Sequence, residues 1–105
     1  MNAPRFGLPP ETVEKIRGVL ALHPQIEKAV VYGSRAKGNY RNGSDIDLTL
    51  FGEGLDLNEL LRIMNELDDL LLPYTIDLSI FATLTHPALL DHIRRVGVTL
   101  YQRIR

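Results

Sequence analysis

The sequence predicts an α/β fold of the α+β kind: a small mixed β-sheet with helices packed on it, in the order α-β-loop-β-α-β-α. Along the chain, segments with apolar residues at helical spacing are interleaved with short segments in which apolar and polar residues alternate. Glycine, proline and asparagine separate these segments. A chain of 105 residues, 45% hydrophobic and 24% charged, suffices for one core. We therefore expect one domain over residues 10–105, after a flexible N-terminal segment at residues 1–9.

Composition excludes several classes of protein. The chain has no cysteine, which rules out disulfides and thiolate metal sites and favours a cytoplasmic location. Its net charge of -1 gives no broad electrostatic attraction to nucleic acid, so we expect no direct nucleic-acid binding. No apolar run is long enough to span a bilayer, and no secretory signal is visible, so we expect no membrane association.

The first helix and the first strand follow from apolar spacing. Pro10 suits the first turn of a helix, and the dipeptide His23-Pro24 ends that helix. The apolar residues at helical spacing are Val13, Ile16 and Leu20. Residues 29–32 then form a short apolar strand closed by Gly33, and residues 34–44 are mostly loop, with room for a helical turn after Ser34.

The second half of the chain repeats strand and helix. Residues 45–51 and 75–81 alternate strictly and predict two strands. Between them lies a helix capped by Asp56, ended by Pro73 and expected to bury one stripe of residues. That stripe consists of Leu57, Leu60, Leu61, Met64, Leu67 and Leu71. A last helix runs from near Pro87 to Gly97, and residues 98–101 form either a short strand or a packed tail.

Three aspartates are expected to meet on one face of the sheet. Asp45 and Asp47 lie two apart on a strand, so their side chains project the same way, about 7 Å apart at the backbone. A right-handed helical crossover makes the 45–51 and 75–81 strands parallel neighbours. That pairing brings Asp77 beside the other two carboxylates.

Carboxylates this close repel one another and raise one another's pKa, and a divalent cation reverses that repulsion. Oxygen ligands without cysteine or paired histidine favour Mg²⁺ or Mn²⁺. Three carboxylates can hold two ions, an arrangement that clamps the attacking and leaving oxygens of a phosphoryl-type displacement. Asp45, Asp47 and Asp77 are therefore the candidate catalytic and metal-binding residues.

The loop before Asp45 suits a triphosphate. Gly33 permits a tight turn, and Ser34 offers an N–H and a hydroxyl to phosphate oxygens. Arg35 and Lys37 add positive charge beside it. These four residues are the candidate nucleotide-binding set.

Gly33-Ser34, ten residues, then Asp45-Ile46-Asp47 matches the signature of the polymerase-beta-type nucleotidyltransferase superfamily. The chain resembles its minimal members, such as the antitoxin half of HEPN–MNT toxin–antitoxin pairs. The resemblance implies a nucleotidyltransferase fold in which Asp45 and Asp47 bind both metals, Asp77 binds the catalytic metal, and Gly33 with Ser34 binds the triphosphate.

The resemblance also implies the reaction: transfer of AMP from ATP to a tyrosine of a HEPN-type toxin partner in a hetero-oligomer, with Mg²⁺. Two other functions stay open. One is a non-catalytic binding module that neutralises its partner by forming a complex. The other is transfer to a small molecule or an RNA end.

Several conspicuous residues have simpler interpretations. Ser44 is expected to be structural, and Arg41 is as well explained by a solvated loop as by ligand binding. The histidines show no spacing that suits a ligand set and are expected to be caps or surface residues: His23, His86 and His92.

Overall fold

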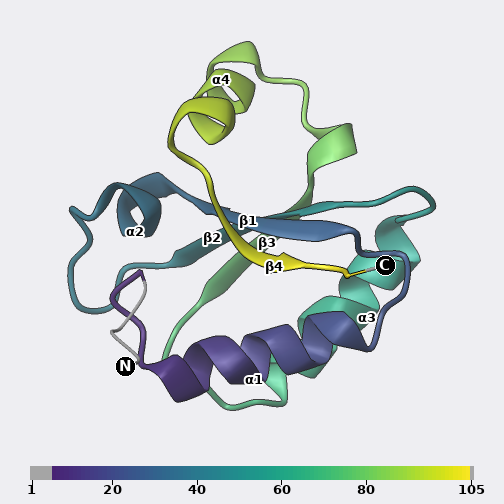
Figure 1. The fold of residues 1–105 in the computed structure, drawn as a ribbon, viewed down its shortest axis with the longest axis horizontal. Coiled ribbons are helices and arrows are strands. Elements are labelled where there is room, and N and C mark those ends of the chain that lie inside the picture. Colours follow the sequence, from purple (N-terminus) through teal and green to yellow (C-terminus); the bar gives the residue numbers. More distant parts are fainter. Residues whose placement is uncertain (1–5, 105) are drawn as a thin grey trace.

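The computed structural model describes residues 6–104, and over that range a mixed sheet carries helices on both faces (Figure 1). The predicted fold class is confirmed. The elements are α1 (Pro10–Ala21), β1 (Lys28–Tyr32), α2 (Gly33–Lys37), β2 (Ile46–Phe51), α3 (Leu57–Asp68), β3 (Ile76–Ile80), the 3₁₀ helix η1 (Phe81–Thr83), α4 (Pro87–Val96) and β4 (Val98–Gln102).

The strands lie in the order β3-β2-β1-β4. β1 pairs antiparallel with both β2 and β4, whereas β2 and β3 are parallel. The parallel pairing places Asp47 directly opposite Asp77, as predicted. Residues 98–102 form an edge strand rather than a tail, because β1 offers them its second hydrogen-bonding edge.

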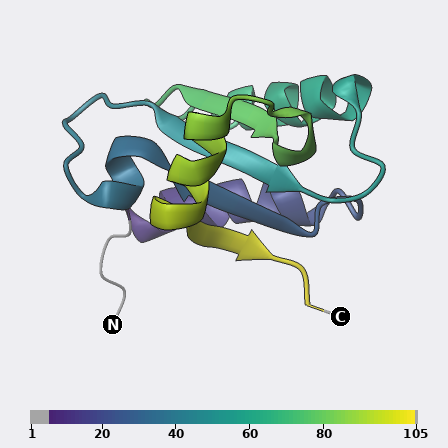
Figure 2. The ribbon, with the colours of Figure 1, turned by 90° about the horizontal axis from the view of Figure 1, so that it is seen from above.

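The two faces of the sheet differ in what covers them. One face is covered by α1 and α3 (Figure 1). The core contains Val31 and Leu48, which are both fully buried. On the other face, α4 packs through Ile93 against Val30 and Tyr32 of β1. Seen from above, α4 lies across the sheet while parts of β2 and β3 stay visible beside it (Figure 2). That second face carries Asp47.

The predicted leucine stripe of α3 is partly wrong. Ile63 and Leu67 are buried and Leu60 and Met64 are half-buried, but Leu57 and Leu61 are 65% and 48% exposed. The helix ends at Asp68, so the 88% exposed Leu71 lies beyond it, at a φ of 55°. The predicted stripe covers more of the helix surface than packs against the sheet. Ile63 lies at the centre of the buried face, so the residues at the edges of the stripe stay exposed.

The N-terminal cap of α3 is confirmed, because the Glu59 N–H donates to Asp56 Oδ1 at 2.9 Å. The Glu59 carboxylate, however, turns to His23 in the bend between α1 and β1. His23 is buried, with Nδ1 2.9 Å from Glu59 and Nε2 2.8 Å from Glu66. The expectation of a cap or surface position is therefore wrong for His23, and right for His86, which accepts the Leu89 N–H at the start of α4.

The segment expected to be flexible is only partly described. Residues 1–5 lie outside the described residues. Within residues 6–9, Leu8 is fully buried in the core and the Phe6 carbonyl accepts a hydrogen bond from Arg35. These contacts connect residues 6–9 to the domain.

No helix in residues 6–104 is both long enough and apolar enough to cross a membrane.

Candidate active site

The predicted carboxylates gather at the ends of two parallel strands. Asp47 is the second residue of β2 and is half-buried, and its partner on β3 is Asp77, which is exposed. Asp45 is also exposed and directly precedes β2 rather than starting it. The parallel register therefore places two of the three aspartates side by side, with the third at the entrance to the same strand.

Burial and neighbouring charges shift the pKa of the Asp47 carboxyl. Burial raises the pKa of this carboxyl, and the negative charges of Asp77 and Asp45 raise it further; a positive charge on His92 would oppose them. Burial likewise raises the pKa of the neighbouring Tyr32 hydroxyl, and Asp47 and Asp77 add to that shift although Ser79 opposes it. The charges of Asp77 and Asp45 therefore act on Asp47.

Gly33 lies at a position in the site where a side chain would be strained. It follows β1 at a φ of 73°, in the left-handed region that L-residues avoid. A Cβ at this position would collide with Oδ2 of Asp47. The missing side chain therefore lets the carboxylate lie directly against the turn that begins α2.

His92 is the site residue that sequence reasoning missed. It projects from α4, and its Nε2 accepts the Gly33 N–H at 3.1 Å. Its ring meets the Tyr32 ring edge-on, with centroids 6.2 Å apart. Because His92 and Gly33 are 59 positions apart, no local pattern could have indicated the contact.

Ser34 and Lys37 remain candidates for nucleotide binding. Ser34 lies in the first turn of α2, where backbone N–H groups have no partner within the helix. Its carbonyl accepts the Gly38 N–H at 2.9 Å and so closes the helix instead of facing a ligand. Lys37 is exposed in the last turn of α2.

Arg35, also predicted to bind nucleotide, makes its contacts within the protein. Its side chain is buried and donates to the carbonyls of Ser44 and Phe6, at distances from 2.8 to 3.1 Å. The guanidinium lies between the rings of Tyr40 and Tyr74, 5.3 and 5.1 Å from their centroids. These contacts hold the glycine-rich loop and the N-terminal segment together.

The Ser44 hydroxyl accepts the Arg41 N–H at 2.8 Å, which agrees with the structural role expected for Ser44.

Across residues 6–104, no three acidic, histidine or cysteine side chains are gathered closely enough to form a ready-made metal centre. The chemistry of the donor set nevertheless fits an oxygen-preferring cation. Asp47, Asp77 and Asp45 supply carboxylate oxygens only, and their mutual repulsion is the interaction that a divalent ion relieves.

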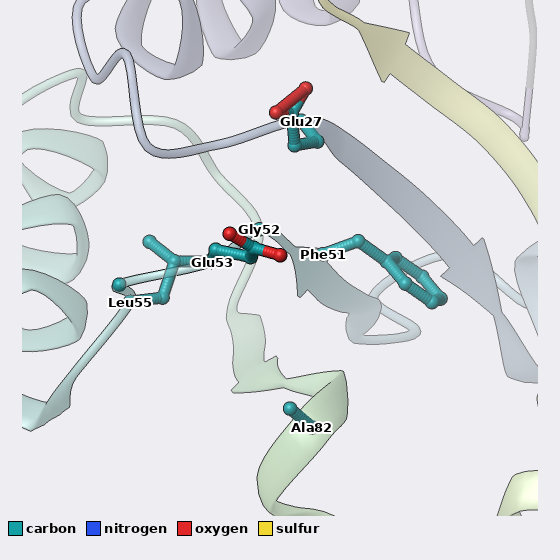
Figure 3. Close-up of a pocket in the computed structure, with 7 residues that line it drawn as sticks. Glu27, Phe51, Gly52, Glu53, Leu55 and Ala82 are labelled. Carbon is teal, nitrogen blue, oxygen red and sulfur yellow. The ribbon is translucent and has the colours of Figure 1, made fainter.

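A cavity of about 700 Å³ lies away from these carboxylates (Figure 3). Its walls come from Glu27 before β1, from the end of β2 with the loop after it, and from Ala82 of η1. That position is the opposite end of β2 from Asp45. This cavity does not coincide with the carboxylates, and we place the candidate site where charge and strand register converge.

Comparison with known proteins gives the family. A family model described as "Polymerase beta, Nucleotidyltransferase" matches residues 14–105. A curated protein of Methanocaldococcus jannaschii, provisionally named a protein adenylyltransferase, is 34% identical over 89 residues, which cover 84% of this chain and 92% of that protein.

Solved structures show the same fold. A crystal structure of a toxin-antitoxin with AMP-PNP is 22% identical at a TM-score of 0.71, over 87% of this chain and 73% of that chain. The tri-AMPylated Shewanella oneidensis HEPN toxin in complex with MNT antitoxin is 19% identical at a TM-score of 0.66, over 89% and 71%. With the family model spanning most of its length, this chain belongs to the polymerase beta nucleotidyltransferase family and is a nucleotidyltransferase.

Proposed function

We propose that this protein transfers AMP from ATP to a tyrosine hydroxyl of a partner HEPN-type toxin, in a Mg²⁺-dependent reaction, and thereby acts as an antitoxin. The observation that carries the proposal is the parallel pairing of Asp47 with Asp77 beside the Gly33-Ser34 turn. Adenylyl transfer requires carboxylates next to a turn that binds phosphate, and we propose these two roles for the aspartates and for the Gly33-Ser34 turn.

Asp45, Asp47 and Asp77 would hold two Mg²⁺ ions, or Mn²⁺ in their place. Bound there, the metal would neutralise phosphate charge and lower the pKa of the acceptor hydroxyl. The protein's own contribution is to bring the carboxylates together through the β2–β3 register and to keep the space beside Asp47 open through Gly33.

The polar groups of α2 would bind the rest of the triphosphate. Ser34 would donate its N–H and hydroxyl to phosphate oxygens, and Lys37 would bring a positive charge to the β- and γ-phosphates. The acceptor oxygen attacks the α-phosphorus, the bond from that phosphorus to the bridging β-oxygen breaks, and pyrophosphate leaves. Asp77 is exposed at this site and would receive the hydroxyl proton.

The choice of acceptor rests on the relatives. One similar structure holds a HEPN toxin that carries AMP together with an MNT antitoxin, and another holds an ATP analogue in a toxin-antitoxin complex. The curated relative's name also describes transfer of an adenylyl group to protein. We therefore propose a protein acceptor that forms a hetero-oligomer with this chain, in preference to a small molecule or an RNA end.

The test is to purify the chain with its native partner and incubate the complex with α-labelled ATP and Mg²⁺. We expect label on a partner tyrosine, identified by mass spectrometry, and none with Asp47→Asn or Asp77→Asn. If the partner stays unlabelled while both variants still neutralise it in cells, inhibition occurs by complex formation and the catalytic proposal is wrong.

A further inference from the structure

His92 joins the last helix to the turn that begins α2. Its Nε2 lies 3.1 Å from the Gly33 nitrogen and accepts that N–H. A neutral imidazole that accepts through Nε2 carries its proton on Nδ1, so the contact specifies one tautomer. The ring is half-buried, and the edge-on contact with Tyr32 restricts its rotation.

Gly33 is consequently held from two directions. The Asp47 carboxylate occupies the space where a Cβ would lie, and His92 binds the N–H. Together these contacts fix the orientation of the peptide group that joins Tyr32 to Gly33. Ser34 follows directly, so the direction of its N–H depends on that peptide group.

The helix that contains Ser34 cannot hold this geometry by itself. α2 has 5 residues, little more than one turn, and isolated helices of that length are unstable in water. Its C-terminal end is fixed by the hydrogen bond from the Gly38 N–H to the Ser34 carbonyl. Its N-terminal end depends on contacts from elsewhere in the fold, and His92 supplies one of them.

We propose that His92 is a positioning residue for nucleotide binding: its imidazole holds the Gly33 N–H and so directs Ser34 toward the triphosphate. The proposal rests on the proposed function only in assuming that Ser34 binds a triphosphate. His92 has no role on the reacting atoms, so removing it should weaken nucleotide binding far more than it slows the chemical step.

The test compares His92→Leu, which removes the acceptor, with His92→Gln, whose side-chain carbonyl can accept the same N–H. We expect the Kd for AMP-PNP, measured by calorimetry, to rise about tenfold in His92→Leu and by less than about threefold in His92→Gln. With ATP and the partner toxin, KM should follow the same order while kcat changes by less than about threefold.

His86 provides the matched control, because it also accepts a backbone N–H in α4, but the donor is Leu89 at the start of that helix rather than Gly33. His86→Leu should lower Tm and leave the nucleotide Kd unchanged. The proposal is overturned if His92→Leu binds AMP-PNP as the wild type does, or if His92→Gln is as impaired as His92→Leu.

Hydrogen exchange at the Gly33 amide tests the contact without nucleotide. Exchange should be slow in the wild type and His92→Gln and faster in His92→Leu. Equal rates in all three proteins would refute the contact. If the wild type binds no nucleotide, the proposed function fails, and the exchange rates still decide whether His92 holds the turn.

Discussion

At the scale of single residues, Asp47 is held where its negative charge is unfavourable. Burial and the two neighbouring aspartates raise the pKa of its carboxyl, so the folded protein keeps this proton to a higher pH than the unfolded chain does. As pH rises from the unfolded to the folded pKa of Asp47, the free energy of unfolding therefore falls. The same charge is what a catalytic cation would bind.

Asp47→Asn should consequently raise the free energy of unfolding near neutral pH without divalent cations, while abolishing transfer. Urea unfolding measures the first effect and labelling of the partner the second. Asp91→Asn is the control, because Asp91 belongs to an exposed pair with Arg95 and should change stability by less than about 0.5 kcal/mol. A less stable Asp47→Asn would show that the carboxylate has favourable partners in the folded state.

Gly33→Ala tests the close approach of backbone to carboxylate. Gly38 makes a matched control, since its φ is 88° but a Cβ there would meet nothing within 4 Å. Gly38→Ala should cost about 1–2 kcal/mol from backbone strain, and Gly33→Ala should cost more because its Cβ also meets Asp47. Urea unfolding gives both values.

If the collision with Asp47 is the cause, combining Gly33→Ala with Asp47→Ala should recover part of that excess cost. A fully additive double variant would contradict the contact.

At the scale of elements, the buried side chain of His23 connects the bend after α1 to two glutamates of α3. Both ring nitrogens of His23 face carboxylates, so the charged imidazolium satisfies both contacts at once. Burial alone would lower the pKa of His23, but hydrogen bonds and charge from Glu59 and Glu66 outweigh it and raise the pKa. This stabilisation is fully present below the unfolded value of about 6.5 and is lost as pH rises through the folded pKa.

Glu66→Gln should therefore reduce the loss of stability as pH rises above the unfolded pKa of about 6.5, because one partner of the imidazolium no longer carries charge. Unfolding free energies from urea titrations at several pH values measure the slope. Glu14→Gln, at an exposed pair with Arg17, should keep the wild-type slope. Identical slopes for Glu66→Gln and the wild type would remove His23 as the cause.

At the scale of the whole molecule, a bound cation should stabilise the fold, because the carboxylates that it joins come from two strands separated by α3. Mg²⁺ at about ten times its Kd should add roughly 1.4 kcal/mol to the free energy of unfolding. We expect Mg²⁺ with AMP-PNP to raise the Tm of the wild type and to leave Asp47→Asn nearly unchanged. Equal shifts in both proteins would place the ion elsewhere.

Much of this fold follows from local patterns. Apolar spacing predicted the first and last helices, and strict alternation predicted the strands that carry Asp47 and Asp77. The parallel pairing of those strands followed from the helix between them. Alternation overestimated the length of both strands, because Asp45 and Thr75 continue the pattern without joining the ladder and Phe81 begins η1.

Residue type and spacing did not determine which polar side chains the fold would bury. Arg35 resembled a phosphate ligand, yet backbone carbonyls of Ser44 and Phe6 bind it. His23 resembled a surface residue, yet it lies between two glutamates of α3. Each outcome depends on partners that only packing brings near.

The sequence by itself determined the order of elements, the acidic face of the sheet and the glycine-serine turn, because each is encoded within a few neighbouring residues. Only the tertiary structure decided that His92 binds Gly33, that Asp47 lies against the turn, and which leucines of α3 are exposed. These contacts join residues far apart in the chain, and their geometry is fixed when the helices pack on the sheet.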